Sequence, residues 1–305
     1  MRIDVITSTR GGPCVWGEGL VHELNKRGYD ARLKNSLKHF LLLPFFTRAD
    51  VVHSTMPLAF KFWKKPLVMS IHGNFMNEKK IYRRLYKMAL NIAKVITTPS
   101  QFMYDAVPLP EKTQIIPNCV EPIKYENTLK EPSFITVMNF DFKDKAEGLK
   151  KVIAMLSRMD FKEYSYTVVG DGKYLEDVKK FVKELGLDIN FVGYQTNVYQ
   201  YLQKATLFIY YSELDNFPLV LLEAMNAGVP VITNNVGAVK EFIKDGVDGF
   251  VAEDNEDYEK KLRKLTSDVL LSAQISEAAL KSVQKNYLWE KVIEEYIEIY
   301  EEMVK

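Results

Sequence analysis

Short apolar runs alternate with amphipathic segments along the first 118 residues of the chain. The apolar runs predict strands at residues 2–7, 49–54, 66–71, 94–99 and 113–118. Between them lie helical patterns, of which residues 17–28 are the clearest, because their apolar positions recur at helical spacing and Gly28 ends the pattern. Strands that alternate with helices in this way are typical of a parallel sheet covered on both faces.

A polar stretch with two prolines, residues 118–132, separates this series from a second one. The second series predicts strands at residues 133–140, 166–170, 189–194, 206–211, 229–233 and 249–253, and helices near 147–158 and 174–185. Residues 288–305 form an acidic amphipathic helix. We expect an α/β protein with two doubly wound parallel-sheet domains, residues 1–125 and residues 126–285.

Composition narrows the class of protein. The 305 residues are 47% hydrophobic, which supplies a substantial core and argues against disorder. The two cysteines, Cys14 and Cys119, lack the spacing of a metal site or a disulfide framework, and this fits a reducing compartment. The N-terminus reads as a strand and not as an apolar leader, so we expect a cytoplasmic protein.

The charge differs between the two parts of the chain. Residues 1–130 carry 20 lysines and arginines against 10 acids, whereas the remainder carries 21 against 30. The first domain should therefore be attracted to something anionic. A nucleic-acid partner would rest on this basic half alone, without a recognised motif, and we expect none.

Two features of the first domain are candidates for binding a polar ligand. Gly11 and Gly12 follow the first strand and open a helix, where backbone N–H groups can approach a phosphate. His72 ends an apolar strand, where an imidazole can donate to a hydroxyl and titrate near physiological pH. The alternatives are a simple glycine turn and a structural histidine.

In the second domain, Lys143 and Lys145 lie where a loop meets a helix start, a suitable location for neutralising a diphosphate. The alternative is a solvated lysine pair. Gly170 and Gly172 form another turn from strand to helix, a weak signal when taken alone.

The densest stretch places Asp215 and Glu223 at either end of the segment NFPLVLL. We expect Pro218 to be the first helical residue, with Asn216 or Phe217 near the cap. Main-chain N–H groups of Phe217, Leu219 and Val220 would then be free for a ligand. A carboxylate in an apolar helix costs several kcal/mol unless it has a partner, and sugar hydroxyls would serve. Alternatively, Asp215 caps the helix and Glu223 pairs with a lysine.

Taken in order, these motifs resemble the retaining glycosyltransferases of family four, which have the GT-B fold of two facing Rossmann-like domains with a cleft between them. The resemblance implies that the C-terminal helix, at about residues 286–305, joins the first domain. The pattern of an acid, seven residues and a glutamate stands here at Asp215 and Glu223. Supporting motifs lie at residues 10–13, 70–73, 116–120, 168–172, 191–194 and 245–251. The resemblance spans nearly the whole chain, and the ordered set is more specific than any single motif.

The resemblance implies a role for each matching residue. Asp215 would contact hydroxyls of the donor sugar, Glu223 the ribose, Lys145 the phosphates and His72 the region of the transferred sugar. Gly11 and Gly12 would face the diphosphate, while Phe191 and Val192 would line the nucleobase. Two departures stand out: Asp215 is shorter than the commoner glutamate, and Asn139 and Phe140 replace a Gly-Arg pair, so that Lys143 or Arg10 would have to replace one phosphate cation.

The activity implied is retaining transfer of a sugar from a nucleoside-diphosphate sugar, the co-substrate, to a hydroxyl acceptor. No separate cofactor is expected, and the absence of an Asp-x-Asp motif predicts that no metal bridges the phosphates. Two alternatives share the architecture: a nucleotide-sugar epimerase, and a binding protein with a degraded site.

Basic and aromatic residues mix in three segments of the first domain, residues 33–48, 60–66 and 78–88. Interfacial membrane sites combine these residue types. The hypothesis is peripheral attachment to the anionic inner face of a membrane, with a lipid-linked or anionic acceptor. The alternative is a solvated basic surface.

Overall fold

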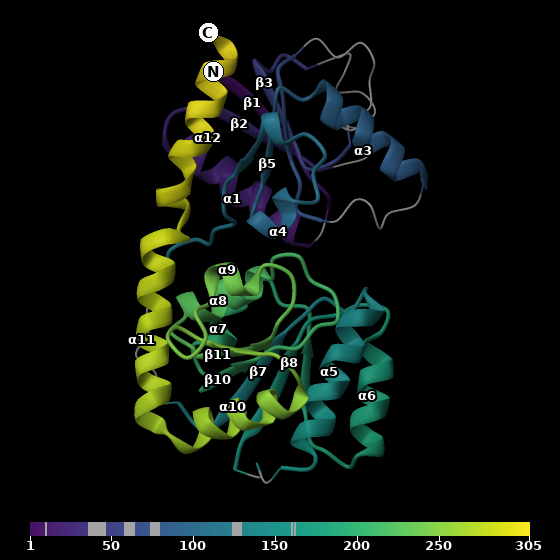
Figure 1. Ribbon diagram of the computed structural model, residues 1–305, viewed down its shortest axis with the longest axis vertical. Coiled ribbons are helices and arrows are strands. Elements are labelled where there is room, and N and C mark those ends of the chain that lie inside the picture. The colour runs from purple at the N-terminus through teal and green to yellow at the C-terminus, as the bar shows by residue number, and fades with distance from the viewer. Residues whose placement is uncertain are drawn as a thin grey trace. The chain divides into compact units, whose positions relative to one another are not determined.

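The computed structural model describes residues 1–9, 11–35, 47–57, 65–73, 80–123, 130–159, 161 and 163–305 (Figure 1). These residues form two compact units, one of Met1–Glu121 with Asn286–Lys305 and one of Pro122–Lys285. Within the described ranges each unit has its own six-stranded sheet, and every strand pair in both sheets is parallel. No helix in the described ranges is both long and apolar enough to cross a membrane.

The sheet of the first unit has the order β2-β1-β3-β4-β5-β6. Its strands are β1 (Arg2–Ile6), β2 (Asp30–Lys34), β3 (Val51–Ser54), β4 (Leu67–Ser70), β5 (Val95–Thr98) and β6 (Thr113–Ile115). Its described helices are α1 (Gly12–Lys26), α3 (Lys80–Ile92), α4 (Gln101–Tyr104), the short 3₁₀ helix η2 (Pro110–Lys112) and α12 (Trp289–Val304). The chain changes its direction of winding between β1 and β3, which is where ligands bind in doubly wound sheets.

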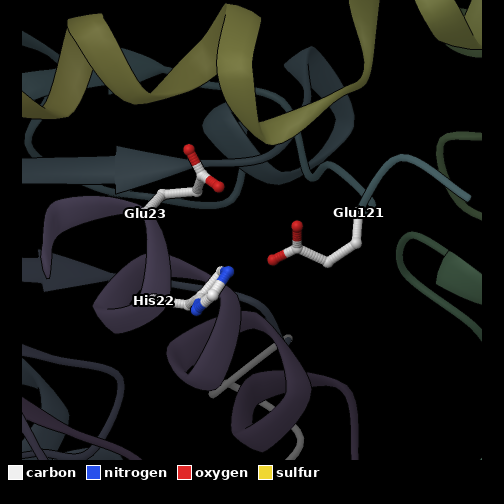
Figure 2. A group of neighbouring side chains, drawn as sticks. All are labelled: His22, Glu23 and Glu121. Atoms are coloured by element: carbon white, nitrogen blue, oxygen red, sulfur yellow. The ribbon is translucent and has the colours of Figure 1, made fainter. Parts of the chain in front are cut away.

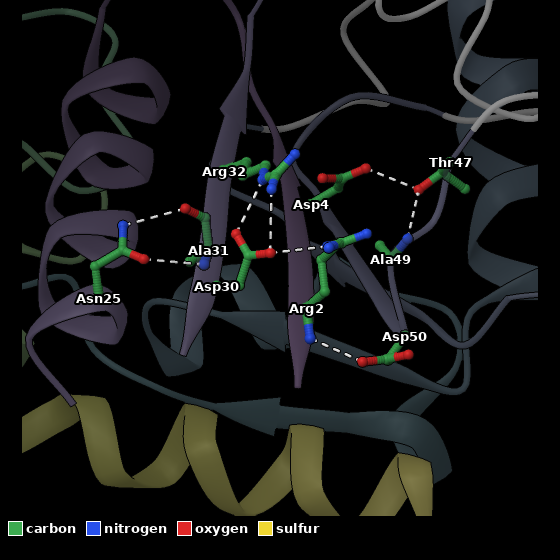
Figure 3. Close-up of polar contacts among 9 residues, drawn as sticks. All are labelled: Arg2, Asp4, Asn25, Asp30, Ala31, Arg32, Thr47, Ala49 and Asp50. Atoms are coloured by element: carbon green, nitrogen blue, oxygen red, sulfur yellow. Dashed lines mark hydrogen bonds and ion pairs between the residues drawn. The ribbon is translucent and has the colours of Figure 1, made fainter. Parts of the chain in front are cut away.

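Strand β2 is missing from the sequence-based prediction, because its residues are mostly polar. Polar contacts hold it in register beside β1 (Figure 3). Asp30 accepts hydrogen bonds from Arg2 and Arg32. These bonds lower the pKa of Asp30, and the bond from Arg32 has the larger effect. The side-chain amide of Asn25 bonds both the N–H and the carbonyl of Ala31. An edge strand with polar anchors needs no alternating apolar pattern.

The last helix, α12, packs along α1 within the first unit, although the two helices come from opposite ends of the chain (Figure 1). Trp16 of α1 meets Trp289 and Tyr296 of α12 in one buried cluster. Gly19 permits this approach, since a Cβ there would lie 2.2 Å from Nε1 of Trp289. The C-terminal segment is therefore part of the core of the first unit.

A buried histidine links α12 to the sheet. The Nδ1 atom of His53 lies 2.5 Å from the hydroxyl of Tyr300, and its Nε2 lies 2.6 Å from the hydroxyl of Ser70. Burial lowers the pKa of His53 to about 3, so the ring is neutral and has a partner on each nitrogen. The structure gives His53 a packing role.

The sheet of the second unit has the order β12-β11-β10-β7-β8-β9. Its strands are β7 (Ser133–Val137), β8 (Ser165–Val169), β9 (Asn190–Gly193), β10 (Leu207–Ile209), β11 (Val231–Asn234) and β12 (Phe250–Ala252). Its helices are α5 (Lys143–Leu156), α6 (Leu175–Glu184), α7 (Tyr199–Leu202), α8 (Leu219–Asn226), α9 (Val239–Phe242) and α10 (Asn255–Ser267), and α11 (Val269–Asn286) follows. Here the winding changes direction between β7 and β10, so the loops that follow these two strands start side by side.

Two helix starts in the second unit differ from the prediction. Helix α5 begins at Lys143, four residues before the expected start at 147. Helix α8 begins at Leu219, and Pro218, expected as the first helical residue, is instead its N-cap in an extended conformation. The shift follows from the fixed φ of proline, which suits an extended cap as well as a first helical turn.

Candidate functional site

The segments that follow β7 and β10 meet in an ion pair. Lys145, in the first turn of α5, places its Nζ 2.6 Å from Oδ2 of Asp215. The hydroxyl of Tyr210, at the end of β10, donates to the same oxygen at 2.7 Å. The side chains of Asp215 and Lys145 are only 12% and 20% exposed, so the pair is screened weakly by water. Two residues singled out from the sequence are thus in direct contact.

The loop that carries Asp215 is held by neighbours that the sequence analysis did not single out. Ser212 and Asn234 exchange two hydrogen bonds, from the Ser212 N–H to Oδ1 and from Nδ2 to the Ser212 carbonyl. Gly237, at φ +55°, packs so closely that a Cβ would lie 2.3 Å from the Asp215 carbonyl oxygen. A polar residue at the end of an apolar strand was the only sequence signal for Ser212 and Asn234. The acid therefore sits on a fixed loop.

Glu223 lies one turn inside α8, on a helix whose other side chains are mostly buried. Burial raises the pKa of its carboxyl group to about 7. Within the described ranges the carboxylate has neither a hydrogen-bond donor nor a cation beside it. The alternative of a lysine partner is therefore not seen, and the group is left able to accept bonds from a ligand.

At the start of α8, the main chain is more available for binding a ligand than the side chains are. Phe217 is buried and stacks on Phe242 with the ring centroids 4.6 Å apart, so its ring belongs to the core. The carbonyl of Asn216 accepts a bond from the N–H of Ala238. Leu219 and Val220 occupy the first turn, where backbone N–H groups lack a partner within the helix.

The other residues predicted for the donor lie around the same sheet. Lys143 is exposed at the first position of α5, and Asp215 pairs with Lys145 instead. Gly170 has φ +138°, and a Cβ there would lie 1.8 Å from the carbonyl oxygen of Met138, so backbone packing alone explains the glycine. Phe191 and Val192 are half-buried on the edge strand β9.

In the first unit, the glycine turn forms as the sequence predicts. Gly11 is the N-cap of α1 with φ +83°, its carbonyl accepts the N–H of Cys14 at 3.0 Å, and Gly12 is the first helical residue. Chain neighbours aside, no atom of the described residues lies within 4 Å of where a Cβ of Gly11 would be, and its φ of +83° is a conformation that favours glycine. Arg10, considered as a substitute phosphate cation, lies outside the described residues.

His72 follows β4 and packs against the ring of Trp16, with centroids 4.7 Å apart. Burial lowers its pKa to about 4, although Asn118 partly opposes the shift. The expectation that it titrates near physiological pH is therefore wrong, because a buried ring resists protonation. Its Nε2 is buried and has no partner in the part of the chain that is described. A neutral imidazole can still accept or donate one hydrogen bond.

The first unit also contains a group of potential metal ligands. Nitrogen and carboxylate oxygens of His22, Glu23 and Glu121 come within 4.8 Å of one another (Figure 2). Both oxygens of Glu23, however, already accept bonds from Lys26 and Arg27. A divalent ion would have to displace or approach these two cations, so the group fits a metal poorly.

Family models match both parts of the chain. Residues 121–282 match the model described as Glycosyl transferases group 1, which is more than half of the chain. Residues 3–123 match the model described as Glycosyltransferase Family 4.

Curated relatives match part of the chain. The N-acetyl-alpha-D-glucosaminyl L-malate synthase of Bacillus anthracis is 30% identical over 187 residues, which cover 60% of this chain and 48% of the relative. The GalNAc-alpha-(1->4)-GalNAc-alpha-(1->3)-diNAcBac-PP-undecaprenol alpha-1,4-N-acetyl-D-galactosaminyltransferase of Campylobacter jejuni is 26% identical over 67% of this chain and 60% of its own length. The matches span about half the length of the first of these relatives and three fifths of the second.

Solved structures share the fold over nearly the whole chain. Anabaena HepE in complex with UDP and glucose superimposes with a TM-score of 0.84 at 16% identity, over 99% of this chain and 100% of that one. Sucrose-phosphate synthase from Thermosynechococcus elongatus also gives 0.84, at 16% identity, over 99% of each chain. With its two parallel doubly wound sheets, the chain has the GT-B fold and belongs to the group 1 glycosyl transferases.

Proposed function

We propose that this chain transfers a sugar from a nucleoside-diphosphate sugar to a hydroxyl acceptor, with retention of configuration and without a bridging metal. The observation that carries the proposal is the arrangement on the second unit. There the Lys145–Asp215 ion pair, and Glu223 with no partner among the described residues, lie on the segments that follow β7 and β10. Family membership and the UDP complexes of HepE, which has the same fold, support it further.

Cleavage of the bond between the sugar and the diphosphate leaves negative charge on the leaving group. Lys145 supplies a cation, and the first turn of α8 supplies N–H groups and the positive end of a helix dipole. The sequence has no Asp-x-Asp motif that would hold a metal between phosphates. Cation and dipole would therefore do the work that a metal does in other transferases.

Two carboxylates would bind the hydroxyls of the donor. Glu223 would accept from the ribose, because hydroxyl donors would replace the solvation that its carboxylate loses on burial. Asp215 would accept from the sugar and not attack it, since its carboxylate is held by hydrogen bonds from its neighbours Lys145 and Tyr210. With retention, the acceptor attacks from the side of the leaving group, and a phosphate oxygen takes its proton.

Features of the first unit support a more specific proposal, in which the acceptor is lipid-linked and lies at an anionic membrane surface. The printed name of the Campylobacter jejuni relative includes undecaprenol. Helix α3 contains four basic residues and no acid, and its Ile81, Tyr82 and Met88 are 59%, 46% and 37% exposed. Exposed apolar and basic side chains on one helix suit a headgroup region. The basic segments at 33–48 and 60–66 lie mostly outside the described residues.

A panel of donors tests the activity. The protein is incubated with UDP-, GDP- and ADP-sugars, with and without polyprenyl-diphosphate saccharide acceptors, and released nucleoside diphosphate is measured. Release that depends on the acceptor, with an α-linkage in the product from an α-linked donor, is expected. An isomerised donor would instead identify an epimerase, and binding without turnover would identify a degraded site.

Vesicle sedimentation tests the membrane surface. Binding to vesicles that contain phosphatidylglycerol, and not to neutral vesicles, is expected to weaken in a variant with Arg83→Glu and Arg84→Glu. A variant with Lys179→Glu and Lys180→Glu, on α6 of the second unit, makes the same charge change elsewhere. Equal binding by the two variants would contradict a role for α3.

A further inference from the structure

Tyr210 is a buried tyrosine with a hydroxyl that needs a partner. It lies directly after β10, its side chain is 1% exposed, and its hydroxyl donates to Oδ2 of Asp215 at 2.7 Å. Its backbone is fixed on both sides, because its N–H donates to the Ile232 carbonyl and its carbonyl accepts from the hydroxyl of Tyr258. Because the backbone is fixed and the ring is packed, the hydroxyl has one defined position.

The hydroxyl of Tyr210 stays protonated under all working conditions. Burial, and after it the negative charge of Asp215, raise the pKa of Tyr210 well above its ordinary value. The phenol therefore acts only as a donor toward the carboxylate.

The two partners of Asp215 share one oxygen. Lys145 and Tyr210 both donate to Oδ2, and no residue in the described ranges donates to Oδ1. A carboxylate held at one oxygen by two donors cannot rotate freely, so its second oxygen has a defined direction and remains able to accept a bond. Two donors on one oxygen thus both anchor and orient the acid.

The two hydrogen-bond donors differ in whether a bound nucleotide sugar can draw them away from Asp215. Lys145 reaches Asp215 through a flexible four-carbon stem, and an arriving diphosphate competes for its ammonium group. Tyr210 has no such competitor, since its ring is enclosed in the core of the second unit. When the lysine turns toward a phosphate, the tyrosine would be the contact that keeps Asp215 in position.

We propose that Tyr210 is a positioning residue that holds the Asp215 carboxylate so that its free oxygen meets the hydroxyls of the donor sugar. The inference rests on the proposed function, because it assumes that a nucleotide sugar binds here. The inference also fits the presence of an aspartate at this position, although an aspartate reaches less far than a glutamate. Because Oδ2 is already anchored, the side chain loses less conformational entropy when the sugar binds.

Calorimetric titrations with UDP and with UDP-glucose, UDP-galactose and UDP-N-acetylglucosamine test the role. The UDP-sugar that binds most tightly to the unmodified chain is chosen as the reference ligand. For each protein, the Kd for UDP is divided by the Kd for this UDP-sugar. The ratio measures how much the sugar contributes to affinity. Tyr210→Phe keeps the ring and removes only the donor, so the ratio should fall about tenfold while the Kd for UDP changes less than about threefold. A purely structural role would weaken UDP and UDP-sugar alike.

Tyr166→Phe is the matched control. Tyr166 is a buried tyrosine on β8 of the same sheet, and its hydroxyl bonds Thr136 at 2.8 Å instead of a site residue. Its loss should leave the ratio unchanged. An unchanged ratio in Tyr210→Phe would overturn the inference and leave the proposed function intact.

A double variant checks that Tyr210 acts through Asp215. In an Asp215→Asn background, Tyr210→Phe should lower the ratio less than about twofold further, because the charged acceptor is already gone. Losses that multiply fully would contradict the inference. If no UDP-sugar binds the unmodified protein more tightly than UDP, the proposed function fails for these donors, and the role of Tyr210 fails with it.

Discussion

Replacing Glu223 by glutamine should change how the stability of the second unit depends on pH. Burial raises the pKa of this carboxyl group from 4.5 to about 7. Below pH 4.5 the folded and unfolded chains both hold the proton, so the free energy of unfolding is not affected. As the pH rises toward 7, the unfolded chain releases its proton first, and the folded state loses stability. At about 1.4 kcal/mol per tenfold change, the loss reaches about 3 kcal/mol above pH 7.

Urea unfolding, followed by far-ultraviolet circular dichroism, measures this loss. Glu223→Gln carries no charge at any pH and should be more stable than the unmodified protein by about 3 kcal/mol at pH 8, but by less than about 1 kcal/mol at pH 4.5. Glu256→Gln, which changes an exposed acid at the start of α10, serves as the control and should show no such pH dependence. A difference between Glu223→Gln and the unmodified protein that is the same at all pH values would refute the reasoning.

The same substitution tests whether the ribose is the missing partner. Hydroxyls that donate to Glu223 favour its charged form, so UDP binding should release a proton, and affinity should rise between pH 5.5 and 8. The ionisation of the phosphates of UDP contributes equally to both proteins, so the difference between them belongs to Glu223. Calorimetry in buffers of different ionisation enthalpy measures the proton. Equal proton release by the variant and the unmodified protein would contradict ribose binding at Glu223.

Three further substitutions probe the contacts around the site and the core. Lys145→Ala should weaken UDP binding by about tenfold or more and lower the Tm, because it leaves Asp215 partly buried without its cation; unchanged UDP affinity would contradict the phosphate role. Gly237→Ala should cost about 2 kcal/mol in urea unfolding, since it combines φ +55° with a Cβ 2.3 Å from the Asp215 carbonyl oxygen, and a neutral effect would mean that the loop adjusts freely. Tyr300→Phe should cost about 1–3 kcal/mol, because it leaves Nδ1 of His53 buried without its partner, while UDP affinity should not change.

The pattern along the chain determined the class of fold. Alternating apolar runs and helical segments are a local property, since each element buries one face or stripe and shows its period in the sequence. Both parallel sheets follow from that alternation, and the motif from Asp215 to Glu223 identified the family because its residues lie close together in the chain. The sequence pattern did not predict strand β2, because Asp30 and its neighbours are held by polar contacts and show no apolar period.

Only the tertiary structure decided which of these residues touch. Lys145 and Asp215 are 70 positions apart, and they meet because β7 and β10 are neighbours in the sheet although two strands separate them in the sequence. Tyr210 looks like one more apolar position until the sheet turns its hydroxyl toward Asp215. The raised pKa of Glu223 is likewise a property of burial, which depends on everything packed around α8. Local periodicity specifies the elements, whereas contacts and pKa values depend on distances between segments that no local pattern contains.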